Sequence, residues 1–140
     1  MLKQVLFLCT GNSCRSQMAE VILNKLGQGG FEASSAGSRP AGYVHPLALS
    51  LLQERGYRVG GLRSKSLDEF LGRKFDVVIT VCDRAKDACP VWHGAEAIPW
   101  SFEDPAEAKG SEAEKRAAFE KVCGQIETRL REFVAARGEK

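Results

Sequence analysis

The sequence predicts an α/β fold, namely an open four-stranded parallel sheet with helices on both faces, which makes a three-layer sandwich. Three observations favour it. Short apolar runs without alternation, such as residues 4–8, are typical of strands that are buried on both faces. Segments with apolar residues at helical spacing alternate with these runs along the chain. The length of 140 residues, 44% of them hydrophobic, suits a single domain spanning residues 1–140.

Four segments have the composition of strands. They are residues 4–8, 31–35, 75–81 and 95–98. The first and third are continuous apolar or β-branched runs, which makes them the clearest. The second is weaker and closes at Ala36-Gly37, and the fourth is followed by an expected loop from Trp100 to Pro105.

Four further segments have the residue spacing or the capping residues of helices. They are residues 14–27, 45–55, 66–71 and 112–136. Glycines end the first two, at Gly27 and Gly56, and Ser66 caps the third. The last helix carries an apolar stripe expected to face the core, formed by Phe119, Val122, Cys123, Ile126, Leu130, Phe133 and Val134.

Chemically reactive residues follow three of the expected strands. Cys9 follows the first strand, Cys82 follows the third, and Asp104 lies in the loop after the fourth. The carboxyl ends of parallel strands share one edge of a sheet, where ligands bind at the topological switch point. If the first and third strands are neighbours, Cys9 and Cys82 face each other there.

The segment CTGNSCRS at residues 9–16 has the composition of an oxyanion cradle. Gly11 and Asn12 tolerate positive φ angles, which turn successive amide groups inward. The helix that follows directs its unpaired N–H groups and partial positive charge at the same point. Arg15 can grip two oxygens of a tetrahedral anion with its planar fork. The expected oxyanion-binding residues are Thr10, Gly11, Asn12, Ser13, Cys14, Arg15 and Ser16.

Cys9 lies at the mouth of this electropositive cradle, which favours its thiolate form. Ser16 could add a hydroxyl donor to the sulfur. The loop is not a nucleotide-binding loop of the Walker type, because no Gly-Lys-Ser/Thr sequence follows. We therefore expect it to hold a tetrahedral oxyanion against a nucleophilic thiolate.

Charge and cysteine content limit the partners and the cellular compartment in which this chemistry is expected. The net charge of +2 offers no basic footprint for nucleic acid or for a membrane surface, and no apolar run is long enough to span a bilayer. The five cysteines are an odd number, which is unusual for a secreted disulfide scaffold. We expect a cytoplasmic monomer whose loop cysteines are catalytic, redox-active or metal-binding.

The motifs CTGNSCRS and Glu103-Asp104-Pro105 resemble the low-molecular-weight tyrosine phosphatase family, whose fold is a flavodoxin-like sandwich, and the resemblance covers essentially the whole chain. Within that superfamily, VCDRAKDACP at 81–90 is similar to the thioredoxin-coupled arsenate reductases. The phosphatases lack this second thiol pair and commonly carry tyrosines after the Asp-Pro, where this chain has Ala106-Glu107.

The resemblance implies that Cys9 attacks arsenate while Asp104 donates a proton to the departing hydroxide. Cys82 then attacks Cys9, arsenite leaves, and Cys89 moves the disulfide outward to Cys82–Cys89. Thioredoxin would reduce that disulfide, with glutaredoxin as an alternative, and no cofactor is tightly bound. The loop at 82–89 is expected to rearrange on oxidation.

The resemblance also bears on metal ions, and no metal site is expected. Some relatives hold potassium beside the loop through asparagine, glutamate and aspartate side chains. Asn12 and Glu20 match this pattern, but Ser66 falls near the place of the aspartate, which makes a potassium ion doubtful.

Several residues have a structural interpretation as well. Cys82 and Cys89 could be incidental thiols or, with His93, zinc ligands, although no Cys-x2-Cys pair supports a zinc site. Cys14 is expected to pack the loop, with a redox side role as the alternative. Asp104 could be a turn residue before Pro105. A further set is expected to be structural or solvated, namely Cys123, His45 and His93.

Two functions compete with arsenate reduction. The first is a small tyrosine phosphatase in which Cys9, Arg15 and Asp104 transfer a phosphoryl group to water; weak phosphatase activity is expected even of the reductase. The second is a redox-sensing or oxyanion-binding module without turnover. The acid Asp104 argues against this second alternative, since a sensor would not need it.

Overall fold

The computed structural model describes residues 2–81, 92 and 94–137. Its elements alternate between strand and helix from Lys3 to Glu54, as expected. In chain order, with η for a 3-10 helix, they are β1 (Lys3–Cys9), α1 (Arg15–Leu26), β2 (Phe31–Gly37), α2 (Pro46–Glu54), η1 (Leu67–Phe70), β3 (Val77–Thr80), β4 (Glu96–Pro99), η2 (Pro105–Glu107) and α4 (Glu112–Arg137).

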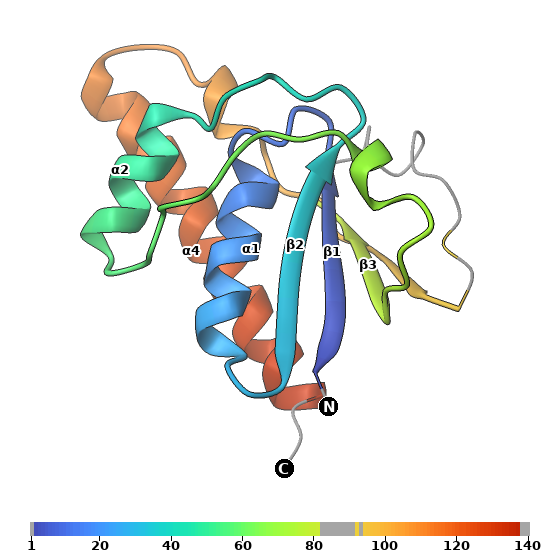
Figure 1. The fold of residues 1–140 in the computed structure, drawn as a ribbon. Coiled ribbons are helices and arrows are strands. Elements are labelled where there is room, and N and C mark those ends of the chain that lie inside the picture. The colour runs from blue at the N-terminus through green and yellow to red at the C-terminus, as the bar shows by residue number, and fades with distance from the viewer. Residues whose placement is uncertain (1, 82–91, 93, 138–140) are drawn as a thin grey trace.

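The four strands form one sheet in the order β2-β1-β3-β4, and every pair is parallel. The expected fold class is therefore confirmed, and β1 and β3 are neighbours. The chain reverses strand order at β1, which lies between β2 and β3 (Figure 1). Residues that leave the carboxyl ends of β1 and β3 consequently start from adjacent points of one edge.

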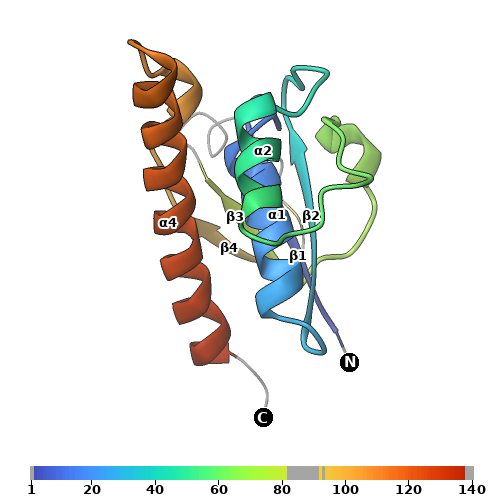
Figure 2. The ribbon, with the colours of Figure 1, turned by 90° about the vertical axis from the view of Figure 1, so that its left-hand side faces the viewer.

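The long helices pack against the sheet and against one another. The helices α1 and α4 are in contact, and α2 packs on α4, so the three lie on one side of the strands (Figure 2). The short η1 lies on the other side, beyond the end of β2 (Figure 1). Among the residues that the structure describes, no helix has the length and hydropathy needed to cross a membrane.

The core has the composition that the periodicities predicted. Val5 to Leu8 in β1 are at most 1% exposed, which is typical of a central strand whose faces are both covered. In α4 the expected stripe is buried, apart from Val134, which is partly exposed. Cys123 belongs to that stripe and is 0% exposed, which confirms its structural place.

One expected element differs. The helix expected at 66–71 is only the 3-10 turn η1, although Ser66 does cap it by accepting a hydrogen bond from the Asp68 amide. The turn cannot extend backward, because Ser66 pairs with Gly37 as an isolated bridge. It cannot extend forward either, because Gly72 has a φ of 87° and redirects the chain.

Candidate active site

A cavity of about 520 Å³ opens at the carboxyl end of the sheet. It brings Cys9, Arg15 and Asp104 together, as the positions of these residues after the strands predicted. The loop after β1 forms one wall and the segment after β4 forms the other. The remaining lining residues are Thr10, Gly11, Ser13, Cys14, Ser101, Phe102, Glu103 and Glu107.

Two of the expected oxyanion-binding residues lie behind the cavity instead of lining it. Asn12 and Ser16 are both 0% exposed. The Asn12 Nδ2 donates to Ser16 Oγ at 2.8 Å and to Ser35 Oγ at 3.0 Å. Their side chains therefore brace the loop from inside the protein, which leaves their backbone N–H groups as the part of each residue that can face an anion.

Asn12 is the residue that shapes the loop. It has a φ of 49° and is the one described non-glycine residue with a positive φ in the molecule, as the tolerance of asparagine for this conformation led us to expect. Gly11 was expected to share this conformation, but it does not. The turn needs only one left-handed residue, and the Asn12 side chain compensates its strain with buried hydrogen bonds.

Gly37 allows β2 to approach the loop closely. It pairs with Cys9 at the end of the β1–β2 register. A Cβ at this position would lie 2.5 Å from the Thr10 carbonyl oxygen and 3.0 Å from both the Cys9 oxygen and the Asn12 nitrogen. All three are backbone atoms, so any side chain here would push the oxyanion loop away from the sheet.

The Arg15 guanidinium spans the cavity to the opposite wall. Its Nη1 donates to the Phe102 carbonyl at 3.0 Å, and its Nη2 lies 3.4 Å from Asp104 Oδ2. The arginine side chain is 11% exposed and the aspartate 27%, so the pair is shielded on one side and open to the cavity on the other. A fixed guanidinium beside an accessible carboxyl group suits binding and protonation of an oxyanion.

Asp104 forms the turn before η2 and also lines the cavity. Its Oδ1 accepts a hydrogen bond from the Ala106 amide at 3.0 Å and caps η2, whose first residue is Pro105. The turn interpretation and the catalytic interpretation are thus compatible, because the cap fixes the carboxyl group against the cavity. The Cys14 thiol approaches the same Oδ1 at 3.7 Å.

Cys14 has the properties of a packing residue in the loop. Its side chain is 3% exposed, and burial together with the nearby Asp104 charge raises the pKa of its thiol to about 11. The thiol is therefore protonated at neutral pH and can donate to Asp104. This fits the expected packing role better than a redox role, which requires a thiolate.

His45 has a structural role, as expected. Its Nδ1 accepts a hydrogen bond from the Leu47 amide at the start of α2, and its ring packs at a tilt against Phe119 with centroids 4.7 Å apart. Burial lowers its pKa. Cys82, Cys89 and His93 lie outside the described residues, and so does the zinc site considered for them.

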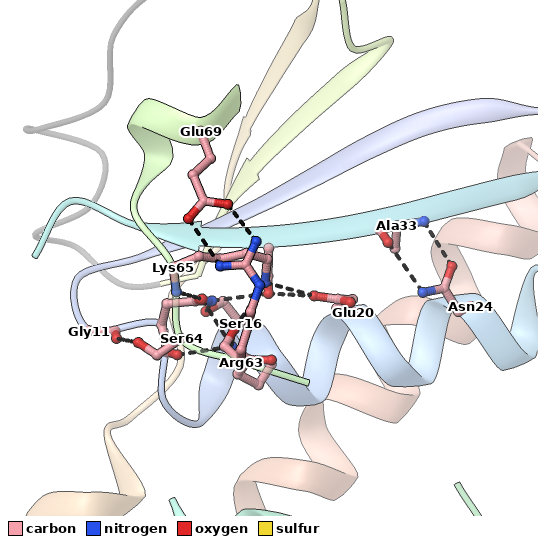
Figure 3. A network of polar contacts seen from close by, with 12 residues as sticks. Gly11, Ser16, Glu20, Asn24, Ala33, Arg63, Ser64, Lys65 and Glu69 are labelled. Carbon is pink, nitrogen blue, oxygen red and sulfur yellow. Dashed lines mark hydrogen bonds and ion pairs between the residues drawn. The ribbon is translucent and has the colours of Figure 1, made fainter. Parts of the chain in front are cut away.

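The residues do not fit a potassium ion. Asn12 Oδ1 already accepts from the Gln17 side chain and the Lys65 amide, both at 2.9 Å. The Glu20 carboxylate accepts from Ser35 at 2.6 Å and lies 3.7 Å from the Lys65 ammonium (Figure 3). A lysine ammonium thus neutralises the carboxylate, where a metal ion would need unoccupied oxygen ligands.

Three supports of the site were not predicted from the sequence. These are the Phe102 carbonyl, Gln17 and the segment from Arg63 to Lys65. A carbonyl has no side-chain signal, and an isolated lysine in a polar loop resembles any solvated one. Gln17 is a fully buried polar residue in the first turns of α1. Helical periodicity, which places it on the buried face, is the signal that could have identified it.

The fold agrees with what the comparisons show. Residues 4–140 match the family model described as low molecular weight phosphotyrosine protein phosphatase, so the chain belongs to that family. Within it, the chain is 40% identical over 132 residues to an arsenate reductase of Halalkalibacterium halodurans, with 94% of each chain covered.

Two further relatives differ in the reductant that their names state. The chain is 33% identical over 135 residues to a glutaredoxin arsenate reductase of Synechocystis, covering 96% of this chain and 98% of that one. It also superposes on the solved thioredoxin-dependent arsenate reductase of Corynebacterium glutamicum with a TM-score of 0.78 and 32% identity. That alignment covers 96% of this chain and 61% of the longer Corynebacterium chain.

Proposed function

We propose that this protein reduces arsenate to arsenite. The observation that carries the proposal is the gathering of Cys9, Arg15 and Asp104 on one cavity at the switch point of the sheet. This arrangement provides a nucleophile, an oxyanion clamp and an acid, and the similar arsenate reductases support arsenate as the anion.

The first step forms a bond between sulfur and arsenic. The Cys9 thiolate attacks the arsenic of arsenate, whose oxygens are held by the loop amides and Arg15. Asp104 acts in its protonated form and gives that proton to the departing hydroxide, which leaves as water. The fixed position of Asp104 at the start of η2 supports this role, because the carboxyl group needs no reorganisation to reach the anion.

The second step transfers two electrons to arsenic. The Cys82 thiolate attacks the Cys9 sulfur, a disulfide forms, and the electron pair of the sulfur–arsenic bond stays on arsenic as arsenite departs. Cys89 then attacks Cys82, so that Cys9 is released as a thiolate and the disulfide becomes Cys82–Cys89.

The backbone next to these cysteines supports the first disulfide exchange. The Val81 amide donates to the Leu8 carbonyl at 2.9 Å, so the residues directly before Cys82 and Cys9 are bonded neighbours. Such proximity suits an attack of Cys82 on Cys9, whose sulfur would otherwise have to be reached from across the cavity. The expected rearrangement of the 82–89 loop remains part of the proposal.

Thioredoxin is the proposed reductant of the Cys82–Cys89 disulfide, with glutaredoxin as the alternative. A dithiol reductant attacks one sulfur of an exposed disulfide and leaves both enzyme thiols reduced. The proposed enzyme acts as a cytoplasmic monomer without a tightly bound cofactor, since the relay needs a compartment that keeps thiols reduced. The relatives whose names state the reductant include one of each kind.

The test measures arsenite release from Cys82→Ser and Cys89→Ser enzymes. Under the proposal, Cys82→Ser releases none, because no second thiol displaces arsenic from Cys9. Cys89→Ser releases about one equivalent per enzyme and stops as the Cys9–Cys82 disulfide. The matched control is Cys123→Ala, which alters a buried thiol remote from the cavity and should retain multiple turnovers.

The same variants separate reductase from phosphatase. Thioredoxin and thioredoxin reductase with NADPH report arsenate reduction, and glutaredoxin with glutathione replaces them in a parallel assay. A wild type that hydrolyses an aryl phosphate but does not reduce arsenate would instead be a phosphatase. In that case neither cysteine substitution should change the rate of hydrolysis. The phosphatase alternative is favoured by the family model itself, and a cavity that holds arsenate also accepts the isosteric phosphate.

A further inference from the structure

A largely buried ion pair lies behind the oxyanion loop, outside the cavity. The Lys65 ammonium is 3.7 Å from Glu20 Oε1, and the two side chains are 11% and 17% exposed. The ammonium also donates to the Arg63 carbonyl at 3.1 Å. Glu20 projects from α1, whereas Lys65 comes from the segment that precedes η1 (Figure 3). Neither residue touches the site where an anion would bind.

Hydrogen bonds connect the Glu20 carboxylate to the loop. Ser35 Oγ donates to Glu20 Oε1 at 2.6 Å, and the side-chain Nδ2 of Asn12 donates to Ser35 Oγ at 3.0 Å. Ser35 and Asn12 are both 0% exposed. Because the Ser35 hydroxyl hydrogen is committed to the carboxylate, its oxygen is available to accept from Asn12. The charge on Glu20 therefore sets the orientation of the whole chain of donors up to the loop.

The backbone around Lys65 holds the same loop from the other side. The Lys65 amide donates to Asn12 Oδ1 at 2.9 Å, and the Ser64 hydroxyl donates to the Gly11 carbonyl at 3.0 Å. The Lys65 carbonyl accepts from the Gly37 amide at 2.9 Å, which ties the segment to the end of β2. This one segment thus contacts Gly11 and the left-handed Asn12 of the loop as well as Gly37 at the end of β2.

The two charges depend on each other. A carboxylate with so little exposure is unfavourable unless a cation or several donors compensate it. Burial lowers the pKa of Lys65, and the Glu20 charge opposes that shift and favours the ammonium. With Lys65 neutral or absent, the Glu20 charge would be held by Ser35 alone among the partners described here.

We propose that Lys65 and Glu20 are positioning residues for the oxyanion loop, and that the Lys65 ammonium is the built-in cation of this ion pair. It holds Glu20, Ser35 and Asn12 in the orientation that presents the loop amides to an anion, so anion binding does not depend on an added monovalent cation. The inference deepens the proposed function, on which it rests only for the role of the loop in binding a tetrahedral oxyanion.

The test measures inorganic phosphate binding by calorimetry in choline chloride and in potassium chloride of equal ionic strength. The wild type should show the same dissociation constant in both salts, within a factor of two. Lys65→Met keeps the apolar stem and removes the charge, so phosphate affinity should fall about fivefold or more in choline. Potassium or ammonium should restore part of that loss, because a small cation can enter beside Glu20.

A double variant separates charge from packing. Glu20→Gln with Lys65→Met removes both charges, so phosphate affinity should recover toward the wild type and lose its response to potassium. If Lys65→Met alone does not fold, the double variant provides the test of the ion pair instead. The matched control is Lys74→Met, an exposed lysine before β3, which should bind phosphate as the wild type does in both salts.

Several outcomes would overturn the inference. A wild type that needs potassium shows that the ammonium is not sufficient, and a folded Lys65→Met that binds phosphate normally shows that it is not needed. If phosphate affinity of the double variant still responded to potassium, the cation would bind somewhere other than beside Glu20. If the wild type binds no phosphate or arsenate at all, the proposed function fails first, and the inference fails with it.

Discussion

Arg15 Nη2 lies 3.4 Å from Asp104 Oδ2 across the candidate active site, although 89 positions separate the two residues in the chain. The guanidinium also donates to the Phe102 carbonyl, so both of its ends are held by the segment after β4. An entering oxyanion must share this guanidinium with Asp104. The acid and the clamp are thereby coupled, and removing either one should affect anion binding and turnover differently.

Replacing Asp104 by asparagine should separate the two effects. Arsenate turnover should fall about 100-fold or more, because the departing hydroxide loses its proton donor. Phosphate should bind as tightly as before or tighter, since the negative charge that competes for Arg15 is gone. Steady-state kinetics and calorimetry provide the two measurements.

The control for this prediction is Glu103→Gln. Glu103 also lines the cavity, but its side chain is 73% exposed and pairs with Lys121. Its substitution should change turnover less than about threefold. If Asp104→Asn weakened phosphate binding as much as it slowed turnover, Asp104 would be a binding residue and not the proposed acid.

Replacing Arg15 by lysine keeps the charge and removes the planar fork. We expect the dissociation constant for phosphate to rise about tenfold or more, because a single ammonium cannot contact two oxygens and the opposite wall together. Calorimetric titration measures this directly. The same change at Arg58, which is exposed, should leave binding unaltered. Equal affinities for wild type and Arg15→Lys would mean that the loop amides alone hold the anion.

A methyl group at Gly37 should disturb the loop through steric overlap. Gly37→Ala places its Cβ 2.5 Å from the Thr10 carbonyl, so we expect a loss of about 1–3 kcal/mol in the free energy of unfolding and weaker phosphate binding. Gly124→Ala is the matched control, because nothing lies within 4 Å of its Cβ. In the middle of α4, that substitution should stabilise the protein by about 0.5–1 kcal/mol.

Urea denaturation of both glycine variants gives the two free energies. If Gly37→Ala unfolded at the same urea concentration as the wild type and bound phosphate normally, the end of β2 would be able to move away from the loop. The close approach of Gly37 to the loop would then be dispensable for anion binding.

The buried Cys123 thiol should make the protein less stable in alkali. Burial raises the pKa of Cys123 from about 9.0 to about 11 in the folded protein. As the pH rises above 9, the unfolded thiol loses its proton first, so unfolding becomes more favourable until the folded thiol also ionises near pH 11. The stabilising contribution is complete below pH 9, and the loss reaches at most about 3 kcal/mol.

Urea denaturation of the wild type and of Cys123→Ala between pH 7 and pH 11 isolates this effect. The variant is expected to be less stable at pH 7, because it leaves a small cavity, but its stability should decline less steeply above pH 9. The pKa of Cys14 is raised in the same direction, so a residual slope remains in the variant. Parallel curves for the two proteins would show that Cys123 does not contribute to the alkaline loss.

Most of the fold was predictable because its signals are local. Unbroken apolar runs specify buried strands, helical spacing specifies the covering helices, and strand order follows from a few connection rules. The segment expected to form a helix at 66–71 is the exception. Its composition suits a helix, but the bridge between Ser66 and Gly37 and the turn at Gly72 leave room only for a 3-10 turn.

By itself, the sequence predicted that Cys9, Arg15 and Asp104 belong to one site. Cys9 and Arg15 share one loop, and the parallel topology alone places Asp104 on the same edge of the sheet. Only the tertiary structure decided what holds that loop in shape. Lys65 reaches Asn12 across 53 positions of sequence, and Gly37 matters only because β2 ends against the loop. Such contacts arise from packing between distant segments, and no periodicity or local motif encodes them.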